Sequence, residues 1–413
     1  MNLIKTSFYT SISTAITFLS GFIVIKVVAV KIGPEGIAFV GQFQNTTAIL
    51  TLLATGAITM GVIKYLAQHK TEPLKVQKII HSAFLISFFC SLIISVIVLS
   101  SSHYLSRAAF KTTEYWLVYF LFGLFVMLIS FNTLFLAILN GLKEIKKYTL
   151  VNISASLIGV SFTLLGAFYF GLIGVLISST ASGIVVFVMN VFIFKKLGIS
   201  WKPRISNWDK EVFKMLLAFS VMALVSGFIA PAIQILIRDK MILRFSATEA
   251  GYWQAVTKIS DYYLGFITSV LAVYYMPRLS EIQDRHELKT EIKNGYKIIL
   301  PIVGLVAFAI WLFKDLIIHL LFTPQFLPMR PLFAFQLMGD FFKIGSWLLA
   351  YLMIAKAMTK TFIITEIFFS LSYVVLSYIF LNKFGIIGAT YSFCINYAIY
   401  WVVMYMIMKK RFL

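Results

Sequence analysis

Charged residues are scarce in this chain, and their scarcity excludes an ordinary soluble domain. Asp, Glu, Lys and Arg make up 13% of the 413 residues, against roughly 25% in soluble proteins. None of the four occurs between Tyr148 and Phe194. A helix that spans a bilayer needs about 20 apolar residues, so this stretch predicts two spans joined by a tight turn at Phe170–Gly171. The sequence indicates a polytopic membrane protein.

Cysteines are few, and the usual catalytic motifs are lacking. Cys90 and Cys394, the two cysteines, lie inside apolar runs and predict neither a disulfide framework nor a metal site. The sequence contains no GxxxxGK[ST] phosphate loop, no HExxH zinc motif and no Cys/His ligand cluster. The longest predicted loops, 195–214 and 277–297, are too short for a catalytic domain. We therefore expect no enzyme activity and no cofactor.

Charge-poor windows divide the chain into its predicted spans. They cover residues 6–30, 37–63, 79–102, 115–139, 148–170, 171–194, 215–237, 251–276, 298–321, 332–355, 361–381 and 385–408. These windows are too long and too uniformly apolar for barrel strands, so we expect an all-α membrane protein with twelve transmembrane helices. Between two windows, Glu281–Leu288 predicts a short interfacial helix with an ion pair between Glu281 and Arg285.

The basic residues set the predicted orientation in the membrane. The 36 Lys and Arg outnumber the 16 Asp and Glu, and most of them lie at the N-terminus, in every second loop and at the C-terminus. The positive-inside rule then places both termini in the cytoplasm. The net positive charge also favours anionic lipid, whereas no soluble basic module suggests nucleic-acid binding.

One motif recurs at about half the length of the chain. FGLIG begins at Phe170 and FGIIG begins at Phe384, and the Lys pairs that begin at Lys195 and Lys409 have the same offset of 214 residues. An offset of six spans gives both halves the same orientation, as in transporters built from parallel repeats with the substrate site between them. The sequence predicts two six-helix lobes, 1–196 and 215–413, related by a pseudo-two-fold axis along the membrane normal, with a cytoplasmic linker at 197–214. Chance similarity between apolar segments is the alternative.

Six ionisable residues fall well inside predicted spans. They are Lys26, Lys258, Asp261, Asp340, Lys343 and Glu366. Each costs on the order of 3 kcal/mol at a helix centre on insertion scales, so we expect them to face a bundle interior or a wet cavity. The three bases and three acids form a balanced set, which suits a site that must bind an anion and later release it.

The spacing of these residues leaves two interpretations open. Lys258 and Asp261, like Asp340 and Lys343, are three residues apart, so each pair could neutralise itself on one helix face. Lys26 has no acidic neighbour on its own span: it either reaches the membrane surface or binds an anionic group such as phosphate, which Lys holds as a point charge. Glu366 is also alone and could pair with Lys26 or Lys343. Several aromatic residues near these positions could stack on sugar rings: Trp253, Tyr262, Tyr263, Trp347 and Tyr351.

Three stretches resemble the Wzx flippases of Gram-negative bacteria. They are GPEGIAFVGQF (33–43), GYWQAVTKISDYYLGFIT (251–268) and FAFQLMGDFFKIGSWLLAYLMIAKA (333–357), and the similarity extends over essentially the whole chain. It is strongest to the branch that contains the enterobacterial lipid III and O-antigen flippases. The family belongs to the multidrug/oligosaccharidyl-lipid/polysaccharide exporter superfamily, whose members have twelve helices in two lobes.

The resemblance implies a function and a set of site residues. Wzx flippases move an oligosaccharide linked to undecaprenyl diphosphate from the cytoplasmic to the periplasmic leaflet of the inner membrane. Lys26, Lys258 and Lys343 are then the expected substrate-binding residues, and Asp261, Asp340 and Glu366 the expected proton carriers or charge partners. The family does not always carry a Lys at position 258. A monomer that contacts membrane lipids, and also the polysaccharide polymerase and chain-length regulator, is the expected assembly.

Three other classes of polytopic membrane protein are alternatives to a flippase. A drug/cation antiporter of the same superfamily would share the architecture but favours an acidic cavity over a balanced one. A peptidoglycan-precursor flippase usually has two more helices. An O-antigen polymerase is also polytopic, but it should carry a large periplasmic loop, and the predicted outer loops are short.

Overall fold

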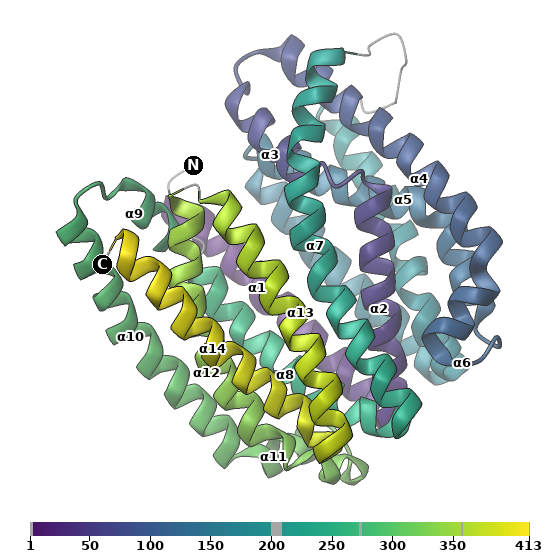
Figure 1. Cartoon of the computed structure of the whole chain (residues 1–413). Helices are drawn as coiled ribbons and strands as arrows, with labels where there is room; N and C mark the ends of the chain where they lie inside the picture. Colours follow the sequence, from purple (N-terminus) through teal and green to yellow (C-terminus); the bar gives the residue numbers. More distant parts are fainter. Residues whose placement is uncertain (1–2, 200–208, 272–274, 357, 413) are drawn as a thin grey trace. The chain divides into compact units, whose positions relative to one another are not determined.

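The computed structural model is helical throughout the residues that it describes, which are 3–199, 209–271, 275–356 and 358–412 (Figure 1). Ten of these helices are long and apolar enough to cross a membrane. Their outer faces stay apolar: on α4 (Pro73–Phe110), Leu92, Ile93, Val96 and Ile97 are 48–60% exposed. Such a stripe is unusual on a soluble protein and suits contact with lipid. The predicted class, an all-α membrane protein, is confirmed.

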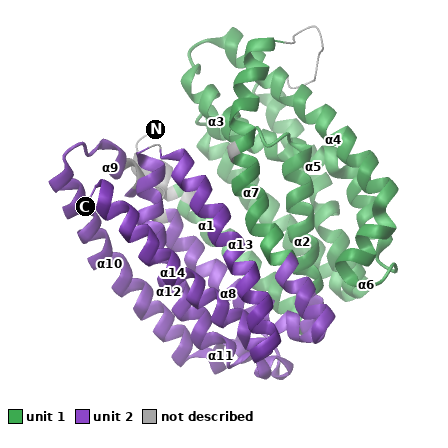
Figure 2. Cartoon of the chain, in the orientation of Figure 1, with its two compact units in different colours: residues 1–32, 39–235 green, residues 33–38, 236–413 purple. Residues whose placement is uncertain are grey.

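The chain divides into two compact units (Figure 2). Unit 1 comprises residues 1–32 and 39–235, and unit 2 comprises residues 33–38 and 236–413. The division falls inside α7 (Lys210–Arg244), whereas the sequence places it at the linker 197–214, half of which lies outside the described residues. The lobe boundaries remain a prediction.

Unit 1 is a bundle held by aromatic contacts. Besides α4 and parts of α2 (Pro34–Ala54) and α7, it contains α1 (Leu3–Lys31), α3 (Thr59–Gln68), α5 (Trp116–Gly141) and α6 (Ile145–Lys196). Phe135 of α5 lies between Phe84 of α4 and Phe194 of α6, with ring centroids 5.2 and 4.4 Å away. All three rings are buried, so this core joins the helices through apolar packing.

The second unit is organised around α12 (Leu332–Ala355). Its other helices are α8 (Ala247–Val270), α9 (Met276–Glu281), α10 (Arg285–Leu312), α11 (Lys314–Leu321), a 3-10 turn (Pro324–Met329), α13 (Thr359–Phe384) and α14 (Ile387–Arg411). α12 packs against α8, α9, α10, α13 and α14. More than half of the residues in its apolar membrane-spanning stretch are buried, the largest share among the ten candidate spans. A polar residue on α12 is therefore placed among neighbouring helices and away from lipid.

The two FGxIG motifs build the same turn. Gly171 divides α6 into two helices at φ 58° and ψ −137°, and Gly385 separates α13 from α14 at φ 68° and ψ −156°. This region of conformation is nearly restricted to glycine. The second glycine of each motif, Gly174 or Gly388, packs against the backbone of the helix before the turn, at Gly166 and Phe380 respectively, and these contacts are also 214 residues apart. The tight turn at Phe170–Gly171 is confirmed, and the repeat extends to local geometry.

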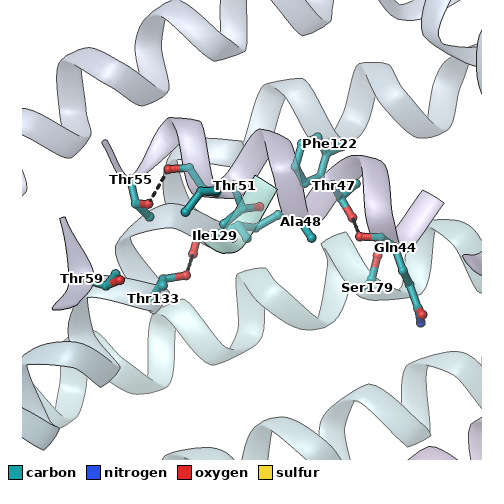
Figure 3. Close-up of a pocket in the computed structure, with 12 residues that line it drawn as sticks. Gln44, Thr47, Ala48, Thr51, Thr55, Thr59, Phe122, Ile129, Thr133 and Ser179 are labelled. Atoms are coloured by element: carbon teal, nitrogen blue, oxygen red, sulfur yellow. Dashed lines mark hydrogen bonds between the residues drawn. The ribbon is translucent and has the colours of Figure 1, made fainter. Parts of the chain in front are cut away.

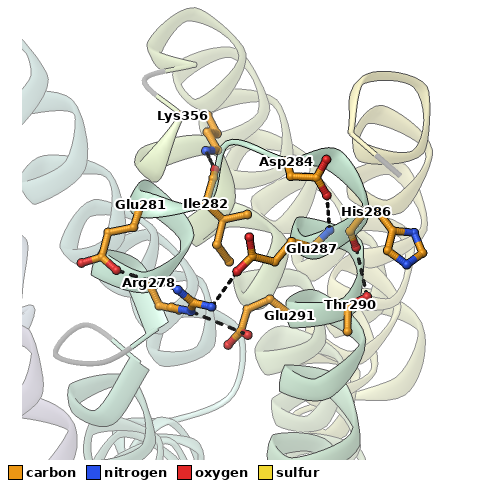
Figure 4. A network of polar contacts seen from close by, with 9 residues as sticks. All are labelled: Arg278, Glu281, Ile282, Asp284, His286, Glu287, Thr290, Glu291 and Lys356. Atoms are coloured by element: carbon orange, nitrogen blue, oxygen red, sulfur yellow. Dashed lines mark hydrogen bonds and ion pairs between the residues drawn. The ribbon is translucent and has the colours of Figure 1, made fainter.

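The predicted interfacial helix at Glu281–Leu288 is wrong. α9 ends at Glu281 and α10 begins at Arg285. Asp284 accepts a hydrogen bond from the backbone N–H of Glu287 at 2.8 Å, and this N-cap starts a new helix where the prediction had one continuous segment. The ion pair in this segment is formed by Arg278 and not by Arg285. Nη2 of Arg278 lies 2.8 Å from Oε1 of Glu287 (Figure 4).

Candidate functional site

Most of the charges predicted inside the membrane lie together in unit 2. α8 carries Lys258 and Asp261, α12 carries Asp340 and Lys343, and α13 carries Glu366. Since α12 packs against both α8 and α13, these residues belong to one region. Lys26 differs: it is exposed on α1 of unit 1.

Asp340 is fully buried and is held by uncharged donors. Its Oδ2 accepts hydrogen bonds from the hydroxyls of Ser260 at 2.6 Å and Tyr263 at 2.7 Å, both on α8. Gln336, one turn earlier on α12, donates to Oδ1 at 3.3 Å. A buried carboxylate needs such partners because desolvation is otherwise costly. The donors also join α8 to α12, so Asp340 has a structural role whatever else it does.

Lys343 is held by aromatic rings. Its Nζ lies 4.9 Å from the ring centre of Trp347, 5.6 Å from that of Tyr397 and 5.7 Å from that of Phe393. Cation–π contacts of this kind stabilise an ammonium without neutralising it. Among the described residues, no carboxylate lies within 4.0 Å of it. A half-buried ammonium of this kind remains able to bind an anion.

The two i,i+3 pairs therefore differ in the structure. Lys258 and Asp261 do approach each other, with Nζ and Oδ2 4.0 Å apart and side chains 28% and 48% exposed. At that distance and exposure an ion pair contributes little. Asp340 and Lys343 interact electrostatically but make no direct contact. The interpretation in which the two members of a pair neutralise each other by direct contact therefore does not describe Asp340 and Lys343.

Glu366 lies on α13, half-buried and close enough to interact electrostatically with Lys343. Of its two candidate partners, Lys343 is the one with which such an interaction is seen. Lys343 thus interacts with two carboxylates, Asp340 and Glu366, without a direct contact to either.

A buried arginine was missed by the sequence interpretation. The predicted span 215–237 ends just before Arg238, but α7 continues to Arg244 and leaves Arg238 fully buried. Its Nε donates to Oε1 of Gln254 at 3.1 Å, and its guanidinium lies 5.8 Å from the ring centre of Trp253. It also interacts electrostatically with Asp261. Two residues of the sequence could have indicated a buried cation here. Gln254 and Trp253 lie four and five residues before Lys258 in the same charge-poor window, and they offer a hydrogen-bond acceptor and an aromatic ring.

The fold is that of a membrane transporter. The chain matches an inward-facing multidrug resistance transporter of the MATE family, in the MOP superfamily, with a TM-score of 0.81 over 96% of this chain and 94% of that one. The identity is 16%, so the likeness concerns the fold alone.

Sequence similarity gives the family. The model of a family described as polysaccharide biosynthesis proteins matches residues 41–331. The chain is 32% identical to the lipid III flippase of Escherichia coli (strain K12) over 406 residues, which cover 97% of this chain and 96% of that protein, and a lipid III flippase of Shigella flexneri gives the same values. The chain belongs to the polysaccharide biosynthesis protein family. The resemblance predicted from the sequence is confirmed.

Proposed function

We propose that this protein flips an undecaprenyl-diphosphate-linked oligosaccharide from the cytoplasmic to the periplasmic leaflet of the Gram-negative inner membrane. The observation that carries the proposal is the 32% identity to lipid III flippases over nearly the full length of both chains. The linked glycan is an enterobacterial common antigen unit or an O-antigen unit. Alternating access moves it, without an enzymatic step.

Only the polar head of such a lipid is difficult to move across the membrane. A diphosphate with several sugars cannot cross hydrocarbon unaided, because its charges and hydroxyls lose their hydration. The polyprenyl tail can remain in lipid throughout. The protein therefore has to supply a polar, positively charged surface for the head and nothing for the tail.

The proposed diphosphate ligands are Lys343, Lys258 and Lys26. Lys343 is the strongest of them because its ammonium is held by aromatic rings and is not neutralised by contact. Asp261, Asp340 and Glu366 are the proposed proton carriers or competing partners of the lysines. A bound diphosphate places negative charge near these acids, and a proton on either Asp340 or Glu366 would relieve the repulsion.

The proposed membrane arrangement has twelve spans. The ten candidate spans count α6 once and omit α8; dividing α6 at Gly171 and adding the charged α8 gives twelve. Both termini are then cytoplasmic, and the lobes predicted from the sequence are related by an axis along the membrane normal. The protein works as a monomer, with the polysaccharide polymerase and chain-length regulator as neighbours in the pathway.

A drug/cation antiporter is the second candidate, because the fold matches a multidrug transporter. Complementation separates the two. Expression in strains lacking either the enterobacterial common antigen flippase or an O-antigen flippase should restore one of these surface glycans. Failure to restore either glycan, together with increased resistance to cationic drugs, would favour the antiporter.

A further inference from the structure

Unit 1 contains a cavity that none of the charged residues lines. Its volume is 440 Å³, and α2, α3, α5, α6 and α7 all contribute to its wall (Figure 3). This volume falls within the range of small-molecule sites, about 300–1,000 Å³. None of the described residues that line it is charged, so these residues supply no counter-charge for a diphosphate or a cationic drug.

Hydroxyl groups dominate the polar wall of this cavity. Three threonines follow one another at intervals of four residues on and just after α2, and other helices supply the rest. The hydroxyl-bearing residues are Thr47, Thr51, Thr55, Thr59, Thr133 and Ser179. Figure 3 shows Thr47 and Thr51 on the ribbon of α2, and Thr133 and Ser179 on other ribbons around the same space. The residues thus come from several helices, and the cavity is more than a stripe on one of them.

The bonds of these hydroxyls determine what they can offer a ligand. Thr47 donates to the carbonyl of Phe43 at 2.8 Å, and Thr55, which is 2% exposed, donates to that of Leu52 at 2.8 Å. Thr133 and Ser179 likewise donate to carbonyls of their own helices. A hydroxyl has one proton and two lone pairs. Because Thr47, Thr55, Thr133 and Ser179 use their protons inside their own helices, their oxygens are available to the cavity as acceptors.

We propose that this cavity binds the sugar units of the lipid-linked glycan, a proposal that rests on the proposed function. Sugar hydroxyls and acetamido N–H groups are numerous neutral donors, and they match a wall of uncharged acceptors. The apolar lining residues Leu52, Phe122 and Ile129 provide surface for the C–H faces of the rings. The cavity then recognises the glycan, while the lysines recognise the diphosphate that all such carriers share.

The test compares two carriers that differ only in their sugars. The probes are the lipid-linked oligosaccharide of the strain that complementation rescues and undecaprenyl diphosphate without sugar. Purified full-length protein is titrated with each, before and after Thr47→Val with Thr51→Val. The double variant should bind the sugar carrier about tenfold more weakly, since two hydrogen bonds are lost, and the bare carrier as well as wild type does.

A matched control lies on the same helix. Thr46 donates to the carbonyl of Gln42 at 2.9 Å, as Thr47 does to Phe43, but it does not line the cavity. Thr46→Val should leave the binding of both carriers unchanged. If the double variant does not fold, Thr51→Val alone serves, because Thr51 makes no side-chain hydrogen bond to another described residue; about threefold weaker binding of the sugar carrier is expected.

Two results would count against the sugar site, and a third would count against the proposed function. Unchanged binding of the sugar carrier by the double variant would refute the sugar site, and equal weakening for both carriers would indicate that the two threonines have only a general structural role. Wild-type protein that binds neither carrier would instead refute the proposed function. The failure of the inference alone therefore looks different from the failure of the function on which it rests.

Discussion

Replacing Asp340 separates a structural role from a role in transport. Asp340→Ala removes the acceptor of three buried or half-buried donors, those of Ser260, Tyr263 and Gln336. Each unsatisfied buried donor costs about 1–3 kcal/mol, so the total for three donors is roughly 3–9 kcal/mol if no water replaces the carboxylate. Typical stabilities are only about 5–15 kcal/mol. We expect Asp340→Ala to reduce the amount of folded protein severely.

Asp340→Asn keeps the shape of the side chain and changes the charge. The amide oxygen still accepts one or two of these bonds, and the hydroxyls of Ser260 and Tyr263 can accept a bond from the new N–H group. The bonds weaken by about 1 kcal/mol each on losing their charge, but a desolvated carboxylate is removed at the same time, and the two effects largely cancel. Asp340→Asn should fold nearly as well as wild type.

The measurement combines protein level with glycan export. Membrane abundance and thermal unfolding in detergent report the fold, and the glycan at the cell surface reports transport in a strain lacking its own flippase. We expect Asp340→Asn to be abundant and inactive. An Asn variant that exports glycan like wild type would show that the charge is dispensable, and Asp340 would then be a structural acceptor only.

Four further predictions follow from the other contacts. Lys26→Ala should abolish export at near-normal protein levels, and Lys26→Arg should retain part of it; a fully active Ala variant would remove Lys26 from the site. The double change Asp340→Asn with Lys343→Gln should stay inactive, since the two side chains make no direct contact that a paired change could restore; recovery of export would reinstate the ion pair. Gly171→Ala and Gly385→Ala should each lower stability by about 1–3 kcal/mol, because both glycines have positive φ, whereas Gly159→Ala, which meets no atom within 4 Å, should not lower the unfolding temperature. Cysteines at Thr113, Ala247 and Asn382 should react with a periplasmic reagent, and cysteines at Thr71 and Arg411 should not; reaction at Thr71 would overturn the proposed orientation.

The helical spans were predictable because the signal is one of composition. The charge-free stretch Tyr148–Phe194 and the glycine at its centre were sufficient to place two helices and their turn. Residues 281–288 were not predicted correctly, because a capping residue such as Asp284 outweighs helical spacing when it can bond the next turn. Local hydrogen bonds of this kind are visible in sequence only as short patterns with many exceptions.

The charged residues were predictable as a set, but not in their partners. Spacing along one helix suggested the same relation for both pairs, and it describes Lys258 and Asp261 approximately. For Asp340 and Lys343 the partners come from other helices: hydroxyls of α8 in one case and rings of α14 in the other. A single sequence contains no direct information about which helices meet. The burial of Arg238 was not predicted for a related reason, because the end of a span is poorly defined in sequence where charged residues begin.

The separate support of Asp340 and Lys343 has a consequence for transport. If the two were a contact ion pair, a diphosphate that bound Lys343 would leave Asp340 as an unpaired buried charge, and such a charge is costly. Because Ser260, Tyr263 and Gln336 satisfy Asp340 independently, the anion can bind and leave without unpairing it. The aromatic rings around Lys343 have the same effect in the other direction, since they stabilise the ammonium in the empty site. The two side chains thus keep their own partners through the proposed cycle, in which the ligand, and with it the local charge, changes.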